Sequence, residues 1–197
     1  MENYIQAYAA TSKDKTLEKY TSVLRENVEE LNGLIQEILD FRKAEDAGFS
    51  HTHIRRVSVS SLLRTQFEWF YPLSEQHQIQ FKIDAPKELY WNTDSVYFKK
   101  ILANLISNAF KYTEDGGTVR ISLHEEENFL VLKVYNTGKG IEEADMQNIF
   151  DRYRILGTMD NDDNRQNTAR NGLGLFICHS LVQSLGGKID IESEVGQ

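Results

Sequence analysis

Two short segments near the middle of the chain alternate between apolar and polar side chains, and this alternation constrains the fold most. The apolar positions are Val119, Ile121 and Leu123 in the first segment and Leu130, Leu132 and Val134 in the second. A period of two indicates β-strands with one buried face. The acidic stretch Glu125–Glu127 separates them and is predicted to be a solvated turn, so the two strands should form an antiparallel hairpin.

Helices and further strands are predicted on both sides of this hairpin. Helical spacing of apolar residues predicts helices from Ser60 or Ser61 to about Glu75, from Ser95 to Lys111 with Asp94 as N-cap, from Ala144 to Phe150, and from Gly172 to Leu185. Further strands are expected at residues 54–59, 79–83 and 188–192. The predicted fold class is therefore α+β, a two-layer α/β sandwich in which helices cover a mixed sheet.

The first 48 residues predict a separate helical region. Its apolar residues recur every seven positions, at Leu17, Leu24, Leu31 and Ile38. This spacing is typical of a helix in a coiled coil or bundle, and such a stripe needs a partner. We expect a homodimer through this helix; the alternative is an amphipathic helix packed on its own domain. The chain thus divides into residues 1–48 and a domain of residues 52–197, joined by a linker.

Composition and charge exclude several classes of protein. The 22 basic and 30 acidic side chains give a net charge of −8, which argues against direct nucleic-acid binding because that depends on Lys and Arg at the phosphates. The single cysteine, Cys178, excludes an internal disulfide and a cysteine-rich zinc site. No apolar run reaches the ~18 residues of a membrane span, and we expect no signal peptide.

Polar residues on the Ser95–Lys111 helix are the first candidates for chemistry. Asn104 and Asn108 are four residues apart and share a face, and Lys111 follows about one turn later. An amide oxygen suits Mg²⁺, which keeps several of its waters, and an ammonium group suits phosphate oxygens. The same spacing also fits an ordinary polar helix face, and spacing alone leaves both interpretations open.

Two pairs of glycines are the second candidates. Gly138 and Gly140 follow the second alternating segment and allow the backbone to approach a flat ligand. Gly172 and Gly174 open the last helix, whose free N–H groups suit a phosphate. Each pair is a weak signal alone. Neither matches the dinucleotide-binding fingerprint, and the chain contains no P-loop motif.

The order of these motifs along the chain is far more specific than any one of them. The stretches ILANLISNAFKYT, NTGKGI, IFDRYR and NGLGLFI follow one another. Together they resemble the ATP-binding domain of sensor histidine kinases, within the GHKL (Bergerat-fold) ATPase group. The resemblance covers about residues 52–197. It implies the Bergerat ATP-binding fold with ATP and Mg²⁺ as cofactors, and the preceding helix resembles the second helix of a dimerisation hairpin.

The resemblance also implies which residues bind the nucleotide. They are Asn104, Asn108, Lys111, Tyr112, Asn136, Gly138, Gly140, Ile141, Phe150, Gly172, Leu173, Gly174 and Leu175. Asn108 would coordinate Mg²⁺, Lys111 would contact phosphate, and Tyr112 would line the pocket. Phe150 would anchor the base of a lid at residues 151–171 that orders when nucleotide binds. Arg152 or Arg154 would stabilise charge at the γ-phosphate during transfer, although each fits a surface salt bridge nearly as well.

Two pocket residues depart from related ATPases. Asn104 stands where related ATPases carry a glutamate base, and an amide cannot take a proton from water, which suits phosphoryl transfer rather than hydrolysis. Asn136 stands where the family usually has an aspartate that accepts a hydrogen bond from the adenine amine. An asparagine still accepts through its carbonyl oxygen but without the charge. We therefore expect adenine selection to survive with weaker affinity.

Two features of the family are expected to be missing. None of the five histidines, at 51, 53, 77, 124 and 179, has the context of the phosphoacceptor. The sequence also stops where the family has a Gly-rich turn and a last strand, so we expect an exposed sheet edge, with reduced stability or strand exchange. Both absences are consistent with a fragment of a longer kinase, and a pseudokinase is the rarer alternative.

The expected function follows from the resemblance. It is the catalytic ATP-binding region of a two-component sensor histidine kinase of hybrid type, which transfers the γ-phosphoryl group of Mg-ATP to a histidine outside this chain. The expected partners are that histidine-bearing helix and a response-regulator receiver domain. The parent would be anchored in the inner membrane, with this portion in the cytoplasm. The alternatives are a non-catalytic nucleotide-binding or dimerisation module and, less favoured, a hydrolysing ATPase.

Overall fold

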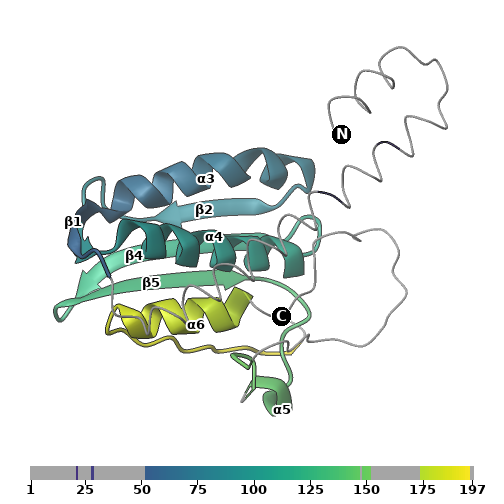
Figure 1. The fold of residues 1–197 in the computed structure, drawn as a ribbon. Helices are drawn as coiled ribbons and strands as arrows, with labels where there is room; N and C mark the ends of the chain where they lie inside the picture. The colour runs from purple at the N-terminus through teal and green to yellow at the C-terminus, as the bar shows by residue number, and fades with distance from the viewer. Residues whose placement is uncertain (1–20, 22–27, 29–51, 147, 152–173, 196–197) are drawn as a thin grey trace.

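The alternating segments form the central hairpin in the computed structural model (Figure 1), which describes residues 21, 28, 52–146, 148–151 and 174–195. Strand β4 (Thr118–Glu126) pairs antiparallel with β5 (Phe129–Asn136). On its other side β4 pairs in parallel with β2 (Gln80–Asp84), so the sheet order is β2-β4-β5. Val119, Ile121 and Leu123 are fully buried, as the period of two predicts.

The turn of this hairpin is shorter than predicted. Glu125 and Glu126 pair with Leu130 and Phe129 and therefore belong to the ladder, so the assignment of the whole acidic stretch to a turn is wrong. The turn consists of Glu127 and Asn128, which both adopt positive φ, at 47° and 69°. Two successive residues with positive φ match the right-handed twist of the flanking strands, and the asparagine tolerates this conformation.

A second, two-stranded sheet lies at the start of the domain. Strand β1 (Arg55–Ser58), within the predicted strand 54–59, pairs antiparallel with β3 (Tyr90–Thr93). Strand β3 is not predictable from the sequence, because four residues after a turn are too few for alternation to be recognised.

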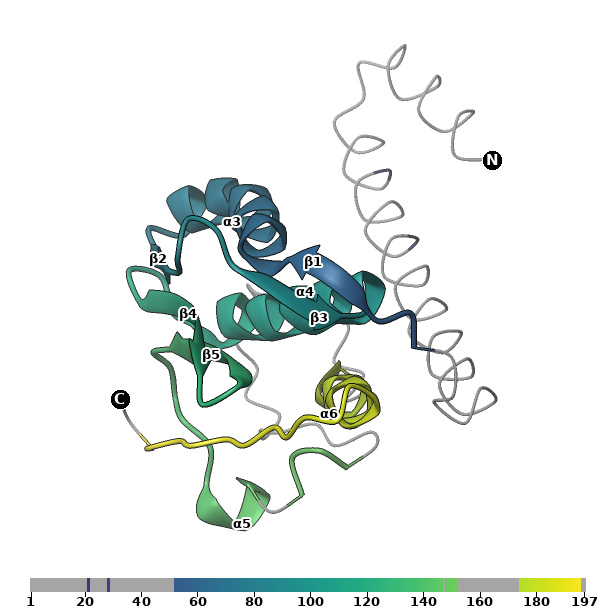
Figure 2. The ribbon, with the colours of Figure 1, turned by 90° about the vertical axis from the view of Figure 1, so that its left-hand side faces the viewer.

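Three helices lie together on one side of the three-stranded sheet (Figure 2). They are α3 (Val59–Gln76), α4 (Ser95–Tyr112) and α6 (Gly174–Ser184). The main core joins α3 and α4 to β2 and β4, while a smaller apolar cluster of Ile101, Ile177 and Leu181 joins α4 to α6. The mixed sheet with helices on it confirms the predicted α+β class.

The N-caps of the two long helices differ. Asp94 caps α4 as predicted, because its carboxylate accepts from the backbone N–H groups of Val96 and Tyr97. The N-cap of α3 is Ser58, so the prediction of Ser60 or Ser61 is wrong. The Ser60 hydroxyl accepts instead from the N–H of Leu89 at 3.0 Å and ties the helix to the segment before β3.

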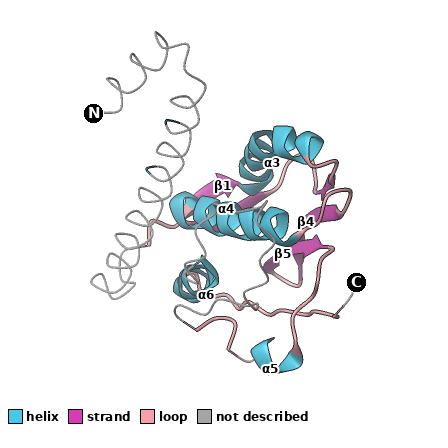
Figure 3. Cartoon of the chain, turned by 90° about the vertical axis from the view of Figure 1, so that its right-hand side faces the viewer, coloured by secondary structure: helices cyan, strands magenta, loops and turns pink. Residues whose placement is uncertain are grey.

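The C-terminal part departs further from the predictions. Helix α5 spans only Glu143–Met146, although residues 144–150 were expected, and α6 begins at Gly174 within its expected range. Residues 188–192 form no strand (Figure 3), so that prediction is wrong. Their exposure does alternate along the segment. Alternation predicts which side chains face the protein, whereas a strand also needs a neighbouring backbone with which to pair.

Several expectations lie outside the described residues. They are the helical region 1–48 except for positions 21 and 28, the lid after residue 151, and the first two residues of the last glycine motif. Within the described part, no helix is long and apolar enough to cross a membrane.

Replacing Asp94 by alanine should lower the free energy of unfolding at neutral pH by about 0.5–2 kcal/mol, the range for loss of an N-cap. Burial raises the pKa of the Asp94 carboxyl, but backbone N–H donors from His53, Tyr97 and Val96 bring it below the ordinary value of 3.8. A lowered pKa stabilises the fold above the unfolded value, and this contribution disappears as the pH falls through the folded pKa. Urea unfolding should therefore show the full difference above about pH 5 and a shrinking one below about pH 4. A difference that stays constant down to acid pH would contradict the capping role.

Candidate functional site

The C-terminal half of α4 and the start of α6 bring two motifs together. A Cβ atom built on Gly174 would lie 3.8 Å from Nδ2 of Asn108, so the second asparagine of the α4 motif lies beside the first residue of α6. The first N–H groups of a helix have no partner within that helix and carry partial positive charge. An amide that can bind a metal therefore lies next to a helix end that attracts anions.

The same face of α4 continues toward Asn104. Asn104 is half-buried, while its Nδ2 atom is fully buried and has no hydrogen-bond partner among the described residues. Leu105, the next residue on α4, packs with the cluster that joins α4 to α6. Ile106 and Ala109 lie on the other side of the helix, in the main core.

The end of α4 lies directly against the loop that follows β5. A Cβ atom on Gly138 would collide with the backbone carbonyl of Tyr112, so only glycine allows this approach. Tyr112 itself is 51% exposed, and Nζ of Lys111 lies 5.7 Å from the centroid of its ring. The α4 motif and the first glycine pair thus share one site, at which the tyrosine ring and the ammonium group are both near the surface.

The remainder of this loop is held by the C-terminal segment. Gly140 has a φ of +74°, and a Cβ atom there would lie 2.7 Å from Cα of Val195. The N–H of Ile141 donates to the hydroxyl of Ser193 at 2.9 Å. The close approach that these glycines allow is therefore to the protein's own backbone. Ser193 was not among the predicted site residues, because no local pattern marks a serine as the partner of a loop 52 residues away.

Asn136 ends β5 at the edge of this loop. Its side-chain Nδ2 donates to the carbonyl of Thr137 at 3.1 Å, which makes Oδ1 the acceptor end of the amide. The hydroxyl of Thr137 accepts from the N–H of Thr118 at 2.9 Å and so ties the loop to the start of β4. Oδ1 is therefore the atom through which this amide could accept a hydrogen bond.

Phe150 is anchored on α6. Its ring stacks on that of His179, with centroids 5.2 Å apart and planes inclined by 24°. Leu175 lies in the first turn of the same helix and is half-buried. The other four candidates, Arg152, Arg154, Gly172 and Leu173, lie outside the described residues.

The donors of this site suit Mg²⁺ better than a transition metal. No group of three His, Cys, Asp or Glu side chains that could hold a metal occurs among residues 52–146, 148–151 and 174–195. Asn108 offers a neutral amide oxygen, its Nδ2 atom lies beside the first residue of α6, and phosphate and water would complete the shell. Mg²⁺ is held in proteins by few protein ligands together with phosphate oxygens and waters, so the residues present fit it.

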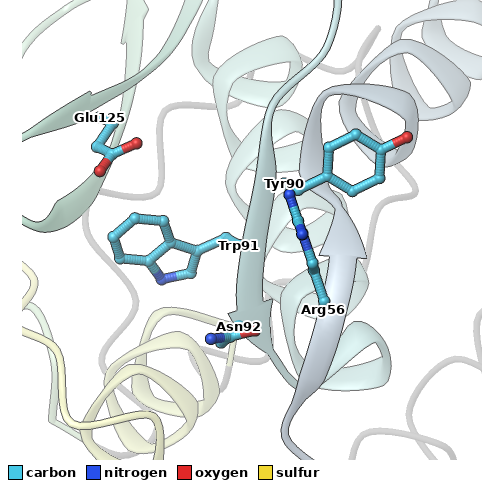
Figure 4. Close-up of a pocket in the computed structure, with 5 residues that line it drawn as sticks. All are labelled: Arg56, Tyr90, Trp91, Asn92 and Glu125. Atoms are coloured by element: carbon cyan, nitrogen blue, oxygen red, sulfur yellow. The ribbon is translucent and has the colours of Figure 1, made fainter.

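A separate hollow of about 400 Å³ lies at the two-stranded sheet (Figure 4). It is lined by Arg56, Tyr90, Trp91, Asn92 and Glu125. The guanidinium carbon of Arg56 lies 5.2 Å from the centroid of the Tyr90 ring. None of the motif residues lines this hollow.

Comparisons with known proteins agree with this geometry. A family model described as "Histidine kinase-, DNA gyrase B-, and HSP90-like ATPase" matches residues 93–197. The sensor protein IrlS of Burkholderia pseudomallei is 28% identical over 194 residues, which cover 96% of this chain and 40% of IrlS. The chain therefore spans well under half the length of this relative.

Two solved structures share the fold. The structure of full-length ShkA in complex with AMPPNP superposes with a TM-score of 0.74 at 23% identity and covers 95% of this chain and 38% of ShkA. The histidine kinase ThkA, in complex with the response regulator protein TrrA, superposes with a TM-score of 0.65 at 20% identity, over 93% of this chain and 51% of that one.

Proposed function

Since the chain belongs to the histidine kinase-, DNA gyrase B- and HSP90-like ATPase family, as a sensor histidine kinase ATP-binding domain, we propose that it transfers the γ-phosphoryl group of Mg-ATP to a histidine outside residues 1–197. The observation that carries this proposal is the position of Asn108 beside Gly174 at the start of α6. This position brings a candidate magnesium ligand next to a helix end that suits phosphate. When bound, Mg-ATP would supply the phosphoryl group, and its Mg²⁺ would offset the negative charge of the phosphates.

In this proposal the residues of the site bind or orient the nucleotide. Asn108 holds the metal, and Lys111 acts as a point charge for phosphate oxygens. Oδ1 of Asn136 accepts from the adenine amine. Arg152 or Arg154 approaches the γ-phosphate, and the lid after residue 151 excludes water.

Asn104 accounts for transfer rather than hydrolysis. A hydrolysing ATPase needs a base near the γ-phosphate to take a proton from water. The Asn104 amide is not basic enough to act as this base, and Asn104 occupies the position at which a carboxylate would be needed. Water at the γ-phosphate therefore remains a poor nucleophile. A neutral imidazole is nucleophilic without a base, so an incoming histidine would react with the γ-phosphate faster than water does.

The wider architecture is part of the same proposal. Residues 1–48 would form part of a dimerisation hairpin that places the domain beside the phosphoacceptor histidine of a homodimer. A receiver domain would then take the phosphoryl group; ThkA, which shares the fold, is seen with a response regulator. The parent would be anchored in a membrane, with this domain on the cytoplasmic side, where ATP is present.

Titration with ATP and with GTP, each with and without Mg²⁺, tests the binding part. We expect Mg²⁺-dependent binding that favours ATP, and tighter ATP binding in Asn136→Asp, because a charged acceptor strengthens a hydrogen bond about twofold. Equal affinity for the two nucleotides in the unmodified protein would contradict the proposed role of Asn136 as the hydrogen-bond acceptor for adenine.

Adding a separate helical hairpin that bears a phosphoacceptor histidine, with γ-labelled ATP, tests transfer. Label on the histidine is the expected result. Nucleotide binding without any transfer would instead favour a non-catalytic module, for which the uncharged amide of Asn136 is the specific observation.

A further inference from the structure

Strand β3 is paired along only one of its two edges in the part of the chain that the structure describes. It forms a two-stranded antiparallel sheet with β1, in which Ser58 lies opposite Tyr90 and Arg56 lies opposite Asn92. A sheet of two strands is marginally stable by itself, and a free strand edge is a template for a further strand. The hollow of about 400 Å³ lies along β3, because three of the five residues that line it belong to that strand.

The pattern of the β1–β3 ladder shows which backbone groups face the free edge. One step beyond the pair of Ser58 and Tyr90, the N–H of Val59 donates to the carbonyl of Leu89 at 3.0 Å. In an antiparallel ladder, hydrogen-bonded pairs alternate with non-hydrogen-bonded pairs. Ser58 and Tyr90 therefore form a non-hydrogen-bonded pair, and so does Asn92, two residues further along β3, with its partner.

Tyr90 and Asn92 consequently direct their backbone N–H and C=O groups away from β1. Both residues are exposed, and none of these four groups forms a hydrogen bond with another residue among those that the structure describes. Donors and acceptors that repeat every second residue are what a neighbouring strand pairs with. The free edge of β3 can therefore pair with a peptide in extended conformation, the mode of binding known as β-augmentation.

The inner face of this edge carries a negative charge. Trp91 packs against the main core, and Figure 4 shows its ring on the side of β3 that faces Glu125. Glu125 lies two residues beyond the buried Leu123 and thus on the same, core-facing side of β4. It is exposed, so its carboxylate stands at the end of an apolar surface that the core no longer covers.

The outer face of β3 carries the opposite charge. Alternation along the strand places Tyr90 and Asn92 on this face, and the guanidinium carbon of Arg56 lies 5.2 Å from the centroid of the Tyr90 ring. Neither Arg56 nor Glu125 forms an ion pair with another of the described residues. A strand bound at this edge therefore meets a carboxylate on one face and a guanidinium group on the other.

We propose that the free edge of β3 binds an extended peptide segment of a partner protein, in which a basic residue directly neighbours an acidic one. Successive side chains of a strand point to opposite faces, so the basic side chain pairs with Glu125 and its acidic neighbour pairs with Arg56. The backbone of the segment pairs with Tyr90 and Asn92 and adds a third strand to the β1–β3 sheet. None of the ATP-motif residues lines this site, so the proposal does not depend on the proposed function.

The first test titrates the capped peptide acetyl-Thr-Val-Glu-Lys-Thr-Val-amide into the ¹⁵N-labelled chain without nucleotide. We expect the backbone N–H signals of Tyr90 and Asn92 to shift saturably, while those of Asn108 and Gly138 stay in place. The absence of a shift at β3 with millimolar peptide would overturn the proposal. Signals of Tyr90 and Asn92 that shift with protein concentration alone would also overturn it, because the edge would then bind a second copy of this chain.

Backbone pairing is tested by N-methylation of the same peptide. The N–H groups of alternate residues in a strand point to the same edge, so methylating the Thr and Glu nitrogens or the Val and Lys nitrogens removes donors from opposite edges. One methylated peptide should bind at least about tenfold more weakly, because several hydrogen bonds are lost together, and the other should bind like the parent peptide. Whichever one fails shows whether the bound strand is antiparallel or parallel to β3. Equal affinity of the two would show that the backbone does not pair.

Asn92→Pro tests the same pairing from the side of the protein. It removes an N–H group that the ladder with β1 does not use, and proline is tolerated on an edge strand at such a position. The chain should stay folded and bind the peptide at least about tenfold more weakly. Asn92→Ala is the matched control, because it keeps the N–H group and should bind normally. Unchanged affinity in a folded Asn92→Pro would contradict the proposed edge.

Charge reversal tests the choice of peptide. Glu125→Lys should weaken binding of the peptide about three- to fivefold, the upper range for an exposed ion pair. A peptide with Glu in place of its Lys should lose affinity for the unmodified chain and regain it for Glu125→Lys. Glu126→Lys makes the same change in net charge on the opposite face of β4, outside the hollow, and should leave both affinities unchanged. Equal effects of the two variants would reduce the charge preference to net charge and refute the assigned pairing.

Discussion

Asn108→Ala is expected to abolish Mg²⁺-dependent ATP binding and to lower phosphoryl transfer by about 10²–10³-fold. This is the range for the loss of one group that stabilises charge in the transition state. Asn108 lies beside Gly174 at the start of α6, so its oxygen can hold the metal where phosphates meet free backbone N–H groups. Calorimetric titration with an ATP analogue, with and without Mg²⁺, measures the first effect, and labelled ATP with a histidine-bearing hairpin measures the second.

The matched control is Asn92→Ala, which removes an exposed amide from β3, at the hollow that contains no motif residue. It should bind and transfer normally. Asn108→Asp should retain metal binding, because a carboxylate oxygen is also a hard ligand. Phosphoryl transfer at full rate in Asn108→Ala would refute the proposed role of Asn108 as a metal ligand, whatever the other variants show.

Leu102→Ala is expected to lower the free energy of unfolding by about 3–4 kcal/mol. Leu102 is fully buried in α4, in the core that joins α3 and α4 to the sheet, and truncation would leave a cavity there. Domains of this size are stable by only about 5–15 kcal/mol, so the loss would be a large share of the total stability. Urea denaturation at neutral pH measures the change.

Val96→Ala controls for the loss of an aliphatic side chain from the same helix. Val96 is 67% exposed, and its truncation should change the free energy of unfolding by less than about 0.5 kcal/mol. If both variants unfolded at the same urea concentration, Leu102 would not be the centre of the core. If Leu102→Ala bound ATP less tightly while still fully folded, α4 would be coupled to the site through its packing.

The central hairpin and α4 were predictable because each has a long periodic pattern. Val119, Ile121 and Leu123 alternate over enough residues to reveal a strand, and Asp94 stands directly before the apolar residues of α4. Strand β3 was not predictable, since Tyr90–Thr93 is short and is stabilised by its pairing with β1. Residues 188–192 show the converse, because their pattern is that of a strand but no neighbouring strand pairs with them.

Within the candidate site, residue types could be predicted but their contacts could not. The spacing of Asn104 and Asn108 placed both on one face of α4, and the order of the motifs indicated ATP. The approach of Gly138 to Tyr112, the hold of Ser193 on Ile141 and the stacking of Phe150 on His179 connect residues far apart in the chain. Nothing in a local pattern encodes such pairs.

The sequence by itself determined the family, the fold class and the candidate residues for the chemistry, because helix and strand periods and motif spacing are local properties. Only the tertiary structure decided which groups meet. It placed Asn108 beside the first residue of α6 and buried the side-chain nitrogen of Asn104. The physical reason is that burial and hydrogen bonding depend on neighbours in space, and the packing of α4 on α6 sets those neighbours.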